Sequence, residues 1–163
     1  MVNTGLIQTQ EFIVTSESTE LETSVRGSIL LFGNDSVTER ISIIAWVNID
    51  PNDWGGVVFY IPGNWNISGV TSSYQQNTTP DNEAVIIWRT GDTDEEYDKR
   101  IEIGMNRYTP SGGGTGVVVI ELDRIDKSAD SSAIFRVLIG VGSDEKDGIR
   151  ISHPDYKVIE VLN

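Results

Sequence analysis

The chain has 163 residues and a mass of 18.0 kDa, which is the size of one domain and tight for two. Its 25 acidic residues outnumber its 12 basic residues and give a net charge of −13, so nucleic acid and anionic membrane surfaces are excluded as expected partners. The absence of cysteine and the single histidine, His153, exclude disulfides, thiolate metal sites and histidine-rich metal sites.

Apolar and polar residues alternate along most of the chain, and a period of two predicts β-strands. The predicted strands, in chain order, are residues 11–15, 21–32, 39–49, 56–61, 64–70, 83–89, 99–106, 116–123, 132–140 and 156–162. Turn residues separate them, including Pro62-Gly63 and Asp147-Gly148. No window has a convincing helical period, and one helical turn is expected at most, within residues 124–131. No run of 18 apolar residues occurs, so membrane insertion is not expected.

Many short strands without intervening helices predict an all-β protein. We expect a two-sheet sandwich of about nine strands with jelly-roll or immunoglobulin-like topology. With no internal repeat or low-complexity linker, residues 11–163 are expected to form a single domain and residues 1–10 a frayed or edge segment. The expected core consists of Ile29, Leu31, Ile41, Ile43, Val47, Val57, Phe59, Val85, Ile87, Ile101, Ile103, Val117, Val119, Phe135, Val137, Ile159 and Val161.

Catalytic motifs are missing from the sequence. A serine triad would need His153, which is followed by a proline, and no serine has the Gly-x-Ser-x-Gly surroundings of a nucleophile. Glu102 and Glu121 alternate with apolar strand residues, which predicts a solvated sheet face rather than a glycosidase pair. The glycine run in residues 111–116 precedes a strand and lacks a lysine, so it predicts a loop and not a phosphate site. The protein is therefore not expected to be an enzyme.

Acidic turns are the candidate metal sites. The segment GDTDEEYD begins like an EF-hand loop, but Tyr97 stands at the sixth position, where that loop needs glycine. Solvated turns are the first expectation, so no cofactor is predicted. The alternative is calcium, the ion that carboxylate oxygens prefer, near Asp144–Asp147 or in the first segment. The candidate ligands there are Asp92, Asp94, Glu96 and Asp98.

The tryptophans are the main candidates for a binding surface. Trp46 and Trp88 lie within predicted strands and are expected in the core. Trp54 and Trp65 lie at loop edges, where glycines leave an aromatic ring room either to pack or to protrude. A sugar-stacking platform would combine aromatic rings with polar neighbours. Its candidate residues are Trp54, Trp65, Tyr74 and Tyr108, with Asn64 and Asn66.

Four segments suggest a family. The alternating strand ISIIAWVNI is followed by the glycine-led strand GGVVFYI, then by WNISGV, and later by GVVVIEL. In this layout residues 20–162 resemble bacterial cohesin-type or carbohydrate-binding-module-type β-sandwich domains. The segment Tyr60-Ile61-Pro62-Gly63 departs from the tyrosine–aspartate–proline turn of cohesins.

The resemblance implies a non-catalytic binding or scaffolding module, secreted or at the cell surface. A cohesin-like module binds another protein module and predicts outward apolar residues on one sheet with an acidic rim. The alternative is a carbohydrate-binding module, which binds polysaccharide through exposed tryptophan and tyrosine rings.

Overall fold

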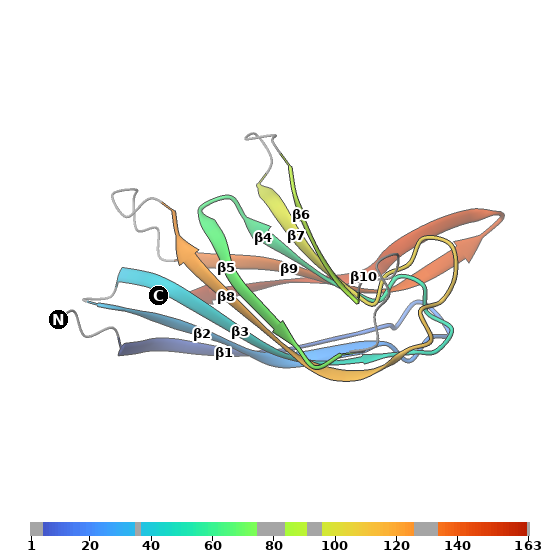
Figure 1. The fold of residues 1–163 in the computed structure, drawn as a ribbon, viewed down its shortest axis with the longest axis horizontal. Coiled ribbons are helices and arrows are strands. Elements are labelled where there is room, and N and C mark those ends of the chain that lie inside the picture. Colours follow the sequence, from blue (N-terminus) through green and yellow to red (C-terminus); the bar gives the residue numbers. More distant parts are fainter. Residues whose placement is uncertain (1–4, 35–36, 75–83, 91–95, 126–133, 163) are drawn as a thin grey trace.

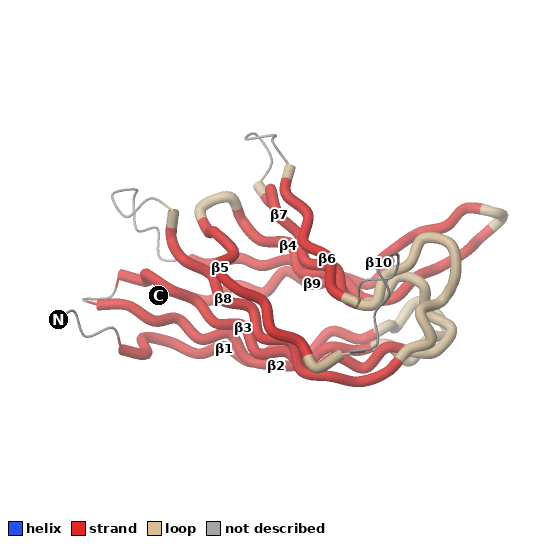
Figure 2. The backbone as a smooth tube through the Cα atoms, viewed as in Figure 1, coloured by secondary structure: helices blue, strands red, loops and turns tan. Residues whose placement is uncertain are grey.

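The computed structural model describes residues 5–34, 37–74, 84–90, 96–125 and 134–162, and these form ten strands. Figure 1 shows the strands arranged in two layers, and Figure 2 shows that every regular element described is a strand. The predicted all-β, two-sheet sandwich is confirmed, with ten strands in place of about nine. The described part of the chain contains no long apolar helix that would cross a membrane.

Each sheet has five strands, and every pairing between described strands is antiparallel. Sheet A has the order β1-β2-β3-β8-β5, formed by β1 (Gly5–Thr15), β2 (Ser24–Asn34), β3 (Val37–Ile49), β8 (Gly114–Arg124) and β5 (Trp65–Ser72). Sheet B has the order β10-β9-β4-β7-β6, formed by β10 (Ile149–Leu162), β9 (Ile134–Lys146), β4 (Val57–Pro62), β7 (Tyr97–Ile103) and β6 (Val85–Arg89).

Two tight turns shape the fold. Gly63 and Asn64 join β4 of sheet B to β5 of sheet A, so the chain changes layers within two residues. Asp147 and Gly148 join β9 to β10 with φ angles of 52° and 78°, the left-handed values that a two-residue hairpin turn requires. The hairpin end of β9 and β10 projects beyond the rest of the sandwich (Figure 1).

The core lies between the inner faces of the sheets and is filled by the alternating apolar residues of nine described strands, with Val85 of β6 packed against them. The expected core is correct except on β8 and β6. On β8 the buried residues are Val118, Ile120 and Leu122, so Val117 and Val119 face outward. Because three consecutive valines occupy both faces of this strand, alternation alone does not determine which face is turned toward the core.

Strands at the sheet edges explain the remaining differences. Because β6 is an edge strand of sheet B, Val85 is only partly buried and Ile87 is 40% exposed. At the edge of sheet A, β1 begins at Gly5, so residues 5–10 form an edge segment along β2, the second of the two expected arrangements. Most of the expected helical turn in residues 124–131 lies outside the described residues.

Candidate ligand-binding face

The outer face of sheet B carries a row of large side chains from neighbouring strands. Tyr60 of β4 lies directly opposite Arg100 of β7, and Arg100 lies directly opposite Trp88 of β6. Side chains opposite one another in a sheet are in contact distance. The guanidinium carbon of Arg100 accordingly lies 5.6 Å from the centre of the Trp88 ring, in a cation–π arrangement.

The next row along the same face is formed by Val58, Glu102 and Ile86. Glu102 is only 5% exposed, and one of its carboxylate oxygens lies 3.5 Å from Nε of Arg100. The expectation of a solvated Glu102 is therefore wrong. Its side chain points away from the core as alternation requires, but residues beyond the sheet cover it.

His153 is one of the residues that stand over this face. A register shift in β10 between Ser152 and Asp155 accompanies a left-handed φ of 57° at His153. Its ring lies within hydrogen-bond distance of the Gly55 carbonyl, with 2.8 Å between Nε2 and the oxygen. Burial lowers the pKa of His153 below its ordinary value of 6.5, and the hydrogen bond to Gly55 opposes this.

Gly140 of β9 makes room for this histidine. A Cβ atom at Gly140 would lie 2.8 Å from Cβ of His153 and 3.1 Å from Cγ1 of Val58. The close approach of the β10 bulge to the sheet therefore depends on a residue without a side chain.

Beside His153, Arg150 of β10 contacts two loops, the β3–β4 connection and the segment after β7. The guanidinium carbon of Arg150 lies 5.2 Å from the centre of the Trp54 ring. Its Nη1 also donates hydrogen bonds to the carbonyl oxygens of Arg107 and Tyr108, at 2.9 and 3.2 Å. The β9–β10 hairpin, the β3–β4 connection and the segment after β7 thus form a wall around one end of the face.

The buried carboxylate of Asp53 connects the β3–β4 connection to β9 by hydrogen bonds. Asp53 is fully buried, and its oxygens accept hydrogen bonds from Thr23 Oγ1 at 2.6 Å, Ser143 Oγ at 2.7 Å and the Gly55 amide at 2.8 Å. Each of these charge-assisted bonds offsets part of the cost of burying the charge. Trp54 follows Asp53 directly in the chain, so this network also positions the Trp54 ring.

Two adjoining depressions result on the outer face of sheet B. The first has a volume of about 280 Å³ and is lined by residues that include Trp54, Tyr60, Arg100, Glu102, Arg150 and His153. The second has a volume of about 290 Å³ and is lined by Tyr60, Trp88, Arg89, Thr90, Tyr97, Asp98, Lys99 and Arg100. Because both include Tyr60 and Arg100, they adjoin across the row described above.

The tyrosines of this face remain neutral donors at physiological pH. Burial raises the pKa of Tyr60 above 10.0, and burial likewise raises that of Tyr97. The two rings meet edge to face with 6.4 Å between their centres. The face therefore combines aromatic planes with hydroxyl, guanidinium and carboxylate groups, which suits stacking and hydrogen bonding to a polar ligand.

The expected sugar platform is not assembled. Trp65 is 6% exposed and packs edge to face against Phe135 at 5.8 Å, because it lies on the inward phase of β5. Tyr74 is also buried, at 2% exposed, so neither ring offers a surface. Trp54 lines the first depression, and Tyr108, 82% exposed, stands at its margin.

The two expected polar neighbours lie elsewhere. Asn64 and Asn66 are exposed after the end of β4, whereas Trp54 precedes the start of β4. The two ends of one strand are far apart, so these asparagines do not join Trp54 in one site.

The expectation that Trp46 and Trp88 fill the core is wrong. Trp46 is 56% exposed and Trp88 is 45% exposed. Each alternates with residues whose side chains face the opposite sheet, so the strand places the indole on the outer face.

The predicted calcium ligands are only partly described. Asp92 and Asp94 lie outside the described residues. Glu96 is exposed, and Asp98 pairs with Lys99 at 2.7 Å between Oδ1 and Nζ. In the second acidic turn, Asp144 pairs loosely with Lys146 at 3.9 Å. Within the described ranges no three acidic or histidine side chains gather as a metal site.

The outer face of sheet A offers a contrasting surface. One row of side chains crosses four strands there, with Ile13 on β1, Arg26 on β2, Trp46 on β3 and Val117 on β8. The guanidinium carbon of Arg26 lies 5.3 Å from the centre of the Trp46 ring. On the same face Glu121 is half-buried and accepts a hydrogen bond from Ser42, so it is not fully solvated as expected.

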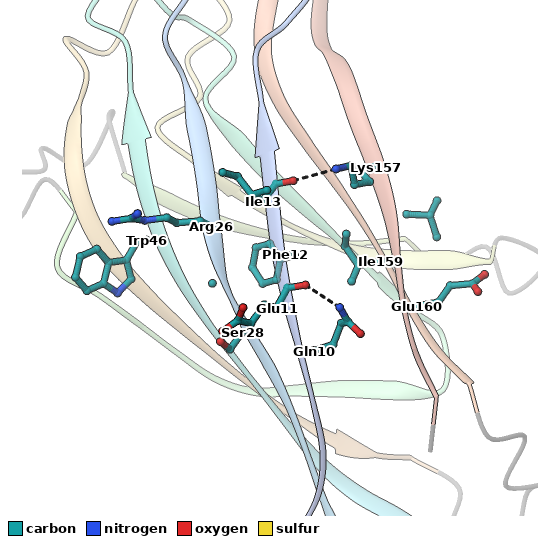
Figure 3. A pocket seen from close by; sticks show the side chains of 12 residues that line it. Gln10, Glu11, Phe12, Ile13, Arg26, Ser28, Trp46, Lys157, Ile159 and Glu160 are labelled. Atoms are coloured by element: carbon teal, nitrogen blue, oxygen red, sulfur yellow. Dashed lines mark hydrogen bonds between the residues drawn. The ribbon is translucent and has the colours of Figure 1, made fainter.

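A larger, open depression of about 820 Å³ runs from this face to β10 (Figure 3). There Lys157 Nζ donates a hydrogen bond to the Ile13 carbonyl at 3.2 Å and links the edges of the two sheets (Figure 3).

No family model matches the chain, and no curated protein matches it.

Proposed function

We propose that the protein is a non-catalytic module that binds a carbohydrate chain across the outer face of sheet B. The observation that carries the proposal is the row of Tyr60, Arg100 and Trp88, of which Tyr60 and Arg100 line both depressions and Trp88 lines the second. Aromatic planes stack on the C–H faces of sugar rings, and the charged groups beside them hydrogen-bond to hydroxyls. Two neighbouring depressions suit two neighbouring sugar units of one chain.

The size and shape of the site agree with this class of ligand. Each depression, at about 280 or 290 Å³, is just below the usual range for a drug-sized ligand, which fits one sugar unit in each. The walls are held by hydrogen bonds that exist without ligand, so little order has to be gained on binding. A secreted or cell-surface location, expected from the sequence, is part of the proposal.

Trp88→Ala tests the site, and Trp46→Ala is its matched control because Trp46 is also an indole, about half exposed, under an arginine on the other sheet. On a glycan array followed by titration, we expect Trp88→Ala to weaken binding about tenfold, the loss of roughly 1.4 kcal/mol of stacking. Trp46→Ala should bind as the wild type does. Absence of binding to any glycan, or equal losses in both variants, would overturn the proposal.

A second candidate function, docking of another protein module, is favoured by the outer face of sheet A. Ile13, Ile44 and Trp46 are 55%, 36% and 56% exposed there, and Glu11 lies at the margin. Outward apolar residues with an acidic rim are what cohesin-like binding predicts.

Cross-linking of the wild-type chain to surface proteins of its source organism tests this second function. Ile44→Asp should abolish a specific cross-link by placing a charge on the apolar surface, and Trp88→Ala should leave it unchanged. A cross-link that survives Ile44→Asp would argue against docking by sheet A.

A further inference from the structure

We infer that the carbohydrate bound by sheet B is anionic and carries carboxylate or sulfate groups, an inference that rests on the proposed function. The described residues lining the two depressions include five cationic and two acidic residues. The whole chain has only 12 basic residues against 25 acidic ones, so this face reverses the balance of the protein. Arg100, Arg107 and Arg150 are three of these cationic residues. The other two, Arg89 and Lys99, lie opposite each other in the inward phase of β6 and β7 and border only the second depression.

Both carboxylates of the lining are already compensated. Asp98 pairs with Lys99 at 2.7 Å, and Glu102 lies 3.5 Å from Nε of Arg100. Arg150 pairs with Glu145, with 3.7 Å between Nε and Oε2. Arg107 is exposed and forms no ion pair with any described residue. The face therefore holds cationic charge that the described protein does not itself neutralise.

The arginines are also held in fixed orientations. Arg100 stacks on Trp88 and Arg150 stacks on Trp54, with 5.6 and 5.2 Å between guanidinium carbon and ring centre. A guanidinium that is already oriented loses less freedom when it binds, and its planar fork matches the two oxygens of a carboxylate or sulfate. Nε of Arg100 is buried and makes no hydrogen bond of its own.

The net charge of −13 does not contradict this assignment. At physiological salt the Debye length is about 8 Å, so distant exposed carboxylates are screened from a group inside the depression. The acidic surface instead opposes the approach of anionic polymers elsewhere on the molecule. Charge thus restricts an anionic chain to the face that carries the arginines.

The test compares ligands that differ in charge but share a backbone. The full chain is titrated calorimetrically with oligogalacturonate and with its neutral methyl ester, and separately with dextran sulfate and neutral dextran. We expect at least one anionic form to bind about tenfold more tightly than its neutral counterpart, as charged hydrogen bonds would give. The two pairs distinguish a carboxylate-bearing from a sulfate-bearing ligand.

Arg107→Gln locates the effect, because the Arg107 side chain lines the first depression without an ion pair to described residues. We expect a loss of about fivefold to tenfold for the anionic ligand. Arg40→Gln is the control, since Arg40 lies on the outer face of sheet A, 4.6 Å from the Phe32 ring centre, and should leave binding unchanged.

The possible failures are distinguishable. Equal affinity for anionic and neutral forms, or equal losses in Arg107→Gln and Arg40→Gln, would overturn the anionic assignment and leave carbohydrate binding in place. Failure of every anionic and neutral glycan to bind would overturn both.

Discussion

The two outer faces of the sandwich contain the same local motif in different surroundings. On sheet A an arginine covers Trp46, and on sheet B an arginine covers Trp88, at nearly equal distances of 5.3 and 5.6 Å. The row that contains Trp46 ends in the apolar residues Ile13 and Val117, whereas the row that contains Trp88 continues to Tyr60, which lines the depression beside His153. The motif alone does not make a ligand site; the loops beside the sheet do.

Hydrogen bonds hold those loops beside sheet B. The β3–β4 connection is tied through Asp53 to Ser143 of β9, and the β9–β10 hairpin is tied through Arg150 to the segment after β7. All of these attachments are at the end of sheet B where β4 begins. Sheet A has no described wall of this kind over its outer face and stays open toward β10.

The largest expected effect separates core aromatic residues from those on the outer faces. Trp65→Ala should lower the free energy of unfolding by about 3–5 kcal/mol, because it removes a buried ring that packs against Phe135. Trp46→Ala and Trp88→Ala should each cost less than about 1 kcal/mol, since both indoles are about half exposed. Urea denaturation measures all three. A cost for Trp46→Ala near that of Trp65→Ala would mean that the outer face of sheet A serves stability rather than binding.

A smaller effect tests the wall over sheet B. Gly140→Ala should cost about 1–3 kcal/mol and displace His153, because the new Cβ would lie 2.8 Å from that of His153. Gly69→Ala is the matched control on sheet A, where a Cβ meets nothing within 4 Å. We expect its effect to stay within about 0.5 kcal/mol. Chemical denaturation gives the energies, and the His153 imidazole resonances report the displacement. Equal costs at both glycines would show that the bulge does not press on the sheet.

The smallest effect is a pH dependence. Because the pKa of His153 is lowered in the folded protein, the unfolded chain binds a proton that the folded chain does not. Stability should be complete above about pH 6.5 and fall as the pH drops from there toward the lowered pKa, by at most about 1.4 kcal/mol per pH unit. The charge of Asp53 raises the pKa of His153 and so opposes the shift, whereas the charge of Arg100 lowers this pKa. Denaturation at pH 7.5 and 5.5 measures the slope, which His153→Gln should remove; an unchanged slope would place its origin in the carboxylates.

Much of the fold follows from local pattern. Alternation identified all ten strands to within a few residues at most ends, and the Asp147-Gly148 turn was visible from its residue types. Alternation also gives Tyr60 and Arg100 the opposite phase to their buried neighbours, whereas Trp88 was expected in the core and is exposed. Nothing in the pattern states that β4, β7 and β6 are adjacent, so the row they form was not predicted.

The sequence by itself determined the fold class, the strands and most of the core, because a period of two and turn chemistry act between near neighbours in the chain. Only the tertiary structure decided which tryptophans are exposed and how deeply Glu102 is covered. Those outcomes depend on strand order, register and the placement of distant loops, such as His153 over Gly140. Such contacts join residues far apart in the chain, and the pattern of residues around each one does not specify its partner.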